Sequence, residues 1–149
     1  MADSDLIKLY SGRILELAAD IPHCGRLEDP QASVRKRSPL CGSTVTVDMD
    51  VRDGRVARFG QDVKACALGQ ASAAVLGRAI IGRTRLEVER ARDELRAMLK
   101  QEGPAPSEPF DGLAVLMPAK DYKNRHASIM LALEAASEAF AQAEESACA

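Results

Sequence analysis

Hydrophobic and polar residues alternate regularly in the segment 44–51. Every second residue from Val45 to Val51 is apolar, and threonine or aspartate stands between them. This spacing predicts a β-strand with one buried face. The segment 32–37 alternates weakly and is basic, which predicts a short edge strand protected by charge.

A turn follows the clearer strand, because an Asp-Gly pair occupies positions 53–54. A loop of two residues would set Met49 opposite Arg58 on the returning strand. A loop of three residues, 52–54, sets Met49 opposite Ala57 and keeps the apolar side chains on one face. We therefore expect the three-residue loop.

Helical spacing of apolar residues predicts three further elements. The first spans residues 3–20, with Asp3 or Ser4 as its cap. The second begins with a capping box at residues 84–87 and continues to about residue 100. Its buried side is expected to carry Leu86, Ala91 (or Arg90), Leu95, Met98 and Leu99. The third begins at Asn124, and its buried side consists of His126, Ile129, Met130, Leu133, Ser137 and Phe140.

The remaining segments complete the prediction of one domain over residues 1–149. Small residues from Cys66 onwards predict a tightly packed helix. Residues 102–109 form a proline-rich loop, the apolar run 113–117 ends at Pro118, and the tail 142–149 is expected to fray. The fold class that follows is α+β, with a three-stranded antiparallel sheet and helices on one face.

Composition excludes several classes of function. Only five aromatic residues are present (three Phe, two Tyr, no Trp) and the net charge is −2, so neither stacking on single strands nor general attraction to nucleic acid is expected. The first ten residues lack the features of a signal peptide, and no window is apolar enough for a membrane span. We expect a cytoplasmic protein whose four cysteines are free thiols or metal ligands.

Candidate chemistry gathers at Cys41, Cys66 and His126. Cys66 begins a helix, where unpaired N–H groups favour a thiolate. His126 lies in the first turn of another helix, where the same field favours the neutral imidazole that binds metals. Cys41 lies in a Pro-Leu-Cys-Gly turn whose glycine leaves room for a bulky ligand. Two thiolates and one imidazole suit zinc or iron and leave one coordination position open.

The spacing alone also fits a structural interpretation. No Cys-x-x-Cys pair is present, and buried cysteines often serve as small apolar residues. Cys66 can be a helix-packing residue among alanines, and His126 a buried side chain with no ligand. Cys24 is expected to be a loop thiol and Cys148 to have no role.

Three motifs over roughly residues 6–140 resemble the NifU-like (IscU-type) iron–sulfur cluster assembly scaffold family. Residues 38–43, Ser-Pro-Leu-Cys-Gly-Ser, resemble the family's Asn-Pro-x-Cys-Gly-Asp. Residues 65–72, Ala-Cys-Ala-Leu-Gly-Gln-Ala-Ser, resemble its Gly-Cys-Ala-x-x-x-Ala-Ser. Residues 125–128, Arg-His-Ala-Ser, occupy the place of its third cysteine.

The resemblance implies a scaffold that receives sulfur from a cysteine desulfurase, binds iron, and passes a cluster, of the [2Fe–2S] type, to recipient apo-proteins. Cys41 and Cys66 would be ligands, with His126 in place of the third cysteine, and a Zn or Fe ion is an alternative cargo. Ser43 replaces the family's aspartate, which should slow cluster release. The segment 116–120 resembles the family's chaperone-docking motif only loosely.

We therefore expect a binding protein, not an enzyme. Two other functions remain open. One is a persulfide carrier that uses Cys41 or Cys66 with His126 as base. The other is an interaction or regulatory protein that holds structural zinc.

Overall fold

The computed structural model describes residues 11–39 and 42–148. Three antiparallel strands, β1 (Ala32–Arg37), β2 (Thr44–Arg52) and β3 (Arg55–Lys64), form one sheet in the order β1-β2-β3. Both predicted strands are therefore confirmed, and β1 is an edge strand. The buried face of β2 carries Val45, Val47 and Met49, as the alternation predicts.

The predicted register of the β2–β3 hairpin is wrong. Its loop has two residues, Asp53 and Gly54, both with positive φ (54° and 75°). A β-bulge after Asp50 then shifts the pairing by one residue, so that Met49 faces Phe59. The bulge restores the apolar face that a two-residue loop alone would have broken, because a shift of one residue moves every side chain to the other face.

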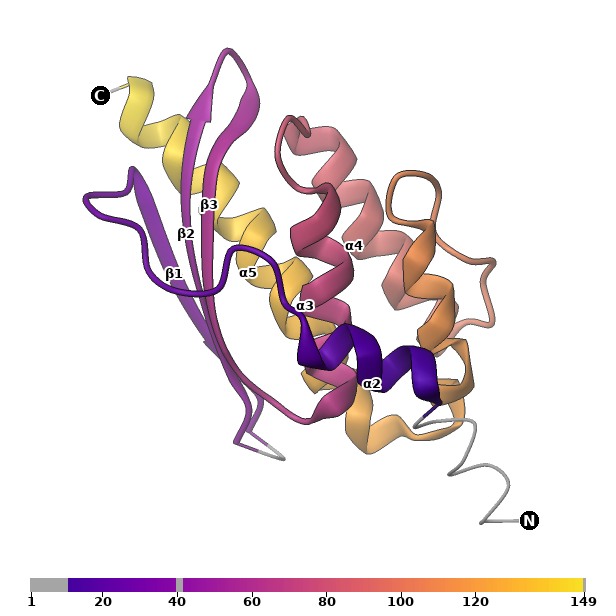
Figure 1. The fold of residues 1–149 in the computed structure, drawn as a ribbon. Helices are drawn as coiled ribbons and strands as arrows, with labels where there is room; N and C mark the ends of the chain where they lie inside the picture. Colours follow the sequence, from indigo (N-terminus) through magenta and orange to yellow (C-terminus); the bar gives the residue numbers. More distant parts are fainter. Residues whose placement is uncertain (1–10, 40–41, 149) are drawn as a thin grey trace.

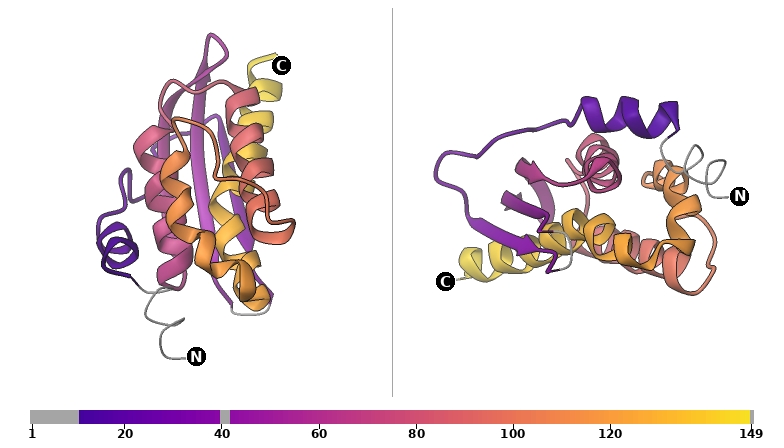
Figure 2. Two further views of the ribbon diagram at one scale, coloured as in Figure 1. Left: turned by 90° about the vertical axis from the view of Figure 1, so that its right-hand side faces the viewer. Right: turned by 90° about the horizontal axis from the view of Figure 1, so that it is seen from below.

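The helices cover one face of this sheet (Figures 1 and 2). Along the chain they are α2 (Gly12–Ala19), α3 (Ala67–Ala79), α4 (Arg85–Lys100), the 3-10 helix η1 (Asp111–Asp121) and α5 (Lys123–Cys148). Helix α5 packs on β1 and β2 and also contacts α3, α4 and η1. The α+β prediction with helices on one face is confirmed. None of the described helices is long and apolar enough to cross a membrane.

The helix boundaries differ from the predictions at several points. Leu86 is 76% exposed because it lies about two and a half turns before Leu95 and so on the opposite side of α4, and Val88 takes the buried position in the first turn. Helix η1 continues through Pro118, since a single missing N–H donor does not end a 3-10 helix whose φ suits proline. Helix α5 starts at Lys123, so Asn124 lies inside it and is not the N-cap, and it extends to Cys148 where a frayed tail was expected.

The first predicted helix is described only from residue 11. Ser11 caps α2 by accepting a hydrogen bond from the N–H of Ile14 at 3.4 Å, and Ile14 and Leu17 are buried. The predicted caps Asp3 and Ser4 lie outside the described residues. The capping box of α4 is confirmed, because Thr84 accepts from the N–H of Glu87 and the Glu87 carboxylate accepts from the N–H of Thr84.

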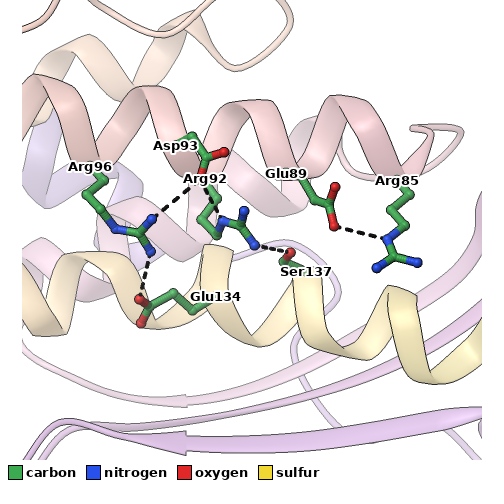
Figure 3. Close-up of polar contacts among 7 residues, drawn as sticks. All are labelled: Arg85, Glu89, Arg92, Asp93, Arg96, Glu134 and Ser137. Carbon is green, nitrogen blue, oxygen red and sulfur yellow. Dashed lines mark hydrogen bonds and ion pairs between the residues drawn. The ribbon is translucent and has the colours of Figure 1, made fainter.

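Arginine side chains join α4 to α5 along their exposed seam (Figure 3). Arg92 donates to the hydroxyl of Ser137 at 2.8 Å, and Arg96 pairs with Glu134 at 3.2 Å. Near the start of α4, Arg85 pairs with Glu144 at 3.0 Å. These contacts supplement the apolar contact between the two helices.

The sheet face opposite the helices is covered only in part. The connection from α2 to β1 crosses it (Figure 1), and there Arg26 binds the fully buried carboxylate of Asp48 at 2.7 Å. The N–H of Leu27 donates to the same carboxylate at 2.9 Å. Burial raises the pKa of Asp48, but hydrogen bonds from Arg26, Ser33 and Leu27 outweigh it, and the pKa lies below its usual value.

Candidate functional site

Three segments that are distant in the sequence meet at one end of the molecule. They are the β1–β2 connection, the start of α3 and the start of α5, at the bottom of Figure 1. The β1–β2 connection is closed by two backbone bonds, from the N–H of Ser38 to the Ser43 carbonyl at 2.8 Å and from the N–H of Gly42 to the Ser38 carbonyl at 2.9 Å. Gly42 has φ of +73°, which glycine adopts without strain.

Cys66 is the N-cap of α3, as the sequence predicted. Its backbone is extended, with φ −67° and ψ 169°, and its thiol makes no hydrogen bond to the helix. The side chain is half-buried. The thiol is thus held at the positive end of a helix dipole while remaining available to other partners.

The partner of the Cys66 thiol is Ser128 on α5. The distance from Sγ to the Ser128 Oγ is 3.4 Å, and Ser128 donates to the hydroxyl of Ser43 at 3.2 Å. Because Ser128 has a single proton, which it gives to Ser43, the neutral Cys66 thiol donates to Ser128. Ser43 and Ser128 are 5% and 1% exposed. A chain of buried hydroxyls therefore connects Cys66 to the segment that follows Cys41.

Gly69 allows α3 and α5 to approach each other at this point. A Cβ at Gly69 would lie 2.8 Å from the Ser128 hydroxyl and 3.1 Å from its carbonyl oxygen. The first distance is shorter than a Cβ contact allows and the second is tight, so a side chain at residue 69 would require Ser128 to shift. The glycine of the motif at residues 65–72 therefore leaves the space that Ser128 occupies beside α3.

His126 is buried, and its ring has other partners. Nε2 lies 3.0 Å from the carbonyl oxygen of Ala119 and 3.1 Å from that of Lys120. Carbonyl oxygens only accept, so Nε2 carries the proton, and Nδ1 is the nitrogen with a lone pair in the neutral ring. His126 lines a hollow of about 420 Å³ that neither Cys66 nor Ser128 lines. Among the described residues, Cys66 and His126 share no hydrogen-bond partner.

The structure describes two of the three predicted ligands, Cys66 and His126. Cys41 lies outside the described residues, so the set of Cys41, Cys66 and His126 stays a prediction. Within the described part of the chain, no three His, Cys, Asp or Glu side chains are close enough to hold a metal ion. Cys24 is an exposed loop thiol. The side chain of Cys148 is not among those described.

Ser128 is the site residue that the sequence analysis missed. The helical spacing predicted one buried stripe of α5, from His126 to Phe140. A second stripe of small residues begins at Ser128 and continues through Ala132, Ala135 and Ala139, all buried. This second helical spacing of small residues was a signal that α5 is buried on two sides and that Ser128 faces inward.

Comparison with known proteins finds relatives of this chain. The NifU-like N terminal domain family model matches residues 9–142. A nitrogen-fixing NifU-like protein (N-terminal) from Brucella abortus is 45% identical, with a TM-score of 0.92 over 95% of this chain and 98% of that one. None of the curated proteins matches.

A second solved structure shares the fold at lower identity. It is a candidate iron–sulfur cluster assembly scaffold protein for the SUF system from Fervidobacterium islandicum AW-1. It is 21% identical, with a TM-score of 0.80 over 90% of this chain and 98% of the other. The family match, which extends from α2 into α5, shows that this chain belongs to the NifU-like N-terminal domain family.

Proposed function

We propose that the chain is an iron–sulfur cluster assembly scaffold or carrier that binds iron and sulfide through Cys41, Cys66 and His126. The observation that carries the proposal is the hydrogen-bonded chain from Cys66 through Ser128 to Ser43. It joins the α3 thiol to the segment that directly follows Cys41. The contact of Cys66 with Ser128 and Ser43 supports a single site for the two motif cysteines, which are 25 positions apart in the sequence.

Sulfur transfer to Cys66 follows from ordinary thiol chemistry. A Cys66 thiolate attacks the outer sulfur of a donor persulfide, a new S–S bond forms, and the donor thiolate leaves. No net oxidation occurs. When Cys66 loses its proton, Ser128 turns its single O–H towards the thiolate. The buried Ser128 hydroxyl thus stabilises the charged form of the thiol.

His126 would supply Nδ1 to the cargo, since Nε2 is held by two carbonyl groups. An imidazole in place of a thiolate makes a [2Fe–2S] cluster less negative and raises its reduction potential. We further propose a cysteine desulfurase as the sulfur source and apo-proteins as recipients. The cluster is cargo and no small substrate is turned over, so the chain is not an enzyme.

Anaerobic reconstitution with iron and sulfide tests the proposal. The parent should develop the visible absorption of a cluster, and Cys66→Ala and Cys41→Ala should each lose it. Cys24→Ala is the matched control, because it removes an exposed thiol outside the site. Absorption that survives in Cys66→Ala, or that is lost in Cys24→Ala, would contradict the assignment.

A persulfide carrier is the second candidate, favoured by the hydroxyl partners of Cys66. The described side chains that hydrogen-bond to its thiol contribute a serine and no carboxylate or second thiol. Sulfane sulfur on Cys66 without bound iron would support the carrier. Stoichiometric zinc that resists exchange would support a structural metal site.

A further inference from the structure

The sheet face opposite the helices carries two rows of side chains beside the proposed site. Strand pairing sets Arg35 beside Thr46 and Thr46 beside Asp62, and it sets Arg37 beside Thr44 and Thr44 beside Lys64. Side chains paired across antiparallel strands lie on the same face. These six residues, called the open rows below, include three cations and one acid.

The orientation of the open rows is fixed by the residue between the two arginines. Lys36 pairs with Glu138 of α5 at 2.8 Å, so it points to the helical face of β1. Successive side chains on a strand alternate between faces, and Arg35 and Arg37 therefore point to the opposite face. Both arginines and Lys64 are exposed.

The three cations of the open rows have no acidic partner among the described residues. None of the ion pairs between described side chains involves Arg35, Arg37 or Lys64, although most of the other arginines form one. Farther along the same face, Arg26 covers Asp48. At the hairpin end of the sheet, Arg52 and its strand partner Arg55 also lack an ion pair among the described residues, so what distinguishes the open rows is three such cations next to the site.

The row of Arg37, Thr44 and Lys64 is the last row of the sheet. Thr44 directly follows Ser43, which accepts from Ser128, and Lys64 lies two positions before Cys66. Beside this row is a hollow of about 290 Å³ whose described lining is Arg37 and Pro39. A molecule seated on the open rows would therefore lie next to the segments that carry the proposed sulfur-accepting thiols.

We propose that the open rows are the docking surface for an acidic face of the protein that delivers sulfur to this site. The inference rests on the proposed function. Unpaired cations on a chain of net charge −2 select for an acidic partner locally, and charge complementarity of this kind speeds association. A nucleic acid is disfavoured because no aromatic side chain occurs in the open rows.

Charge reversal tests the docking surface. The probe is a purified cysteine desulfurase from the organism that carries this chain, with radiolabelled sulfur transfer and the dissociation constant as readouts. Arg35→Glu combined with Arg37→Glu should weaken binding and slow transfer about tenfold or more at low salt, and the difference should shrink at high salt. Lys64→Glu, a single change on the other edge strand, should act in the same direction.

Arg52→Glu is the matched control, since Arg52 is exposed on the same sheet at the opposite end of β2. It makes the same charge change and should leave transfer within about twofold of the parent. Reconstitution with inorganic iron and sulfide needs no partner protein, so it reports on the proposed function separately from docking.

Each outcome has one meaning. Slower transfer in the open-row variants, with normal reconstitution and a normal Arg52→Glu control, supports the docking surface. Parent-like transfer in the open-row variants overturns it while leaving the proposed function intact. Equal loss in the Arg52→Glu control, impaired reconstitution in the open-row variants, or preferential binding of an oligonucleotide to the open rows also overturns it. Absence of both transfer and reconstitution in the parent overturns the proposed function.

Discussion

Arginine side chains gather in two regions of this molecule, and the two differ in pairing. Along the seam between α4 and α5, Arg92 and Arg96 each contact both a residue of their own helix and one on α5 (Figure 3). In the open rows, Arg35 and Arg37 have no acidic partner among the described residues. The seam uses positive charge to join two elements of the fold. The open rows leave it available to another molecule, next to Cys66.

This difference predicts that paired charges contribute to stability and that unpaired charges contribute to association. Loss of a paired charge should therefore lower the free energy of unfolding, and loss of an unpaired charge should leave it nearly unchanged.

The largest change is expected where the open face is covered by an ion pair. Asp48→Asn would place an amide N–H₂ among the donors of Arg26, Ser33 and Leu27. It should lower the free energy of unfolding by about 2 kcal/mol, because charge-assisted bonds are lost and a buried donor is left unpaired. Urea unfolding followed by circular dichroism measures it. An unchanged midpoint would show that the Arg26–Asp48 pair contributes nothing net.

Acid should remove the same contribution in the parent. The pKa of Asp48 is lowered in the folded state, despite the opposing effect of burial, by bonds from Arg26, Ser33 and Leu27. Its stabilisation is therefore complete above the unfolded pKa of about 3.9 and is lost as the pH falls through the lower folded pKa. Stability curves from pH 6 to pH 2 should be flatter for Asp48→Asn than for the parent. Parallel curves would contradict this account.

A smaller change is expected at the seam. Arg96→Ala removes the pair with Glu134, and because Arg96 is 43% exposed the loss should be about 0.5 kcal/mol. The difference between variant and parent should decrease in high salt, since exposed pairs are screened. Thermal unfolding at low and high salt measures both effects. If the decrease in stability were independent of salt, it would come from lost van der Waals contact of the Arg96 side chain and not from the lost ion pair.

The smallest change in stability is expected in the open rows. Arg35→Gln together with Arg37→Gln removes two exposed cations that lie near Lys64 and have no described acidic partner. The thermal midpoint should equal that of the parent or rise slightly as repulsion decreases. A clear decrease would mean that these arginines stabilise the fold, and the contrast with the seam would then disappear.

Local patterns predicted much of the fold because they depend on residues close in sequence. The alternation around Val47 indicated β2, the Thr84–Glu87 capping box marked the start of α4, and Cys66 was correctly placed at the start of α3. Leu86 was wrongly assigned to the core because its spacing of nine residues from Leu95 places it on the opposite side of the helix, where Val88 would have fitted the buried stripe.

The hairpin shows where local reasoning fails. The rule that apolar groups share one face was correct, and yet the loop length chosen from it was wrong. A two-residue turn followed by a β-bulge keeps the apolar side chains on one face, as a three-residue loop would. Both contain one residue more than a two-residue turn without a bulge. The choice depends on backbone conformation at Asp53 and Gly54.

The sequence by itself determined the element types, the position of Cys66 at a helix start, and the family resemblance that the comparisons confirm. Only the tertiary structure decided that Ser128 contacts the Cys66 thiol, that His126 turns Nε2 to carbonyl groups, and which arginines are paired. The contacts of Ser128 join residues 62 and 85 positions apart. Such contacts depend on which faces of α3, α5 and the sheet pack together, and no local pattern specifies that choice.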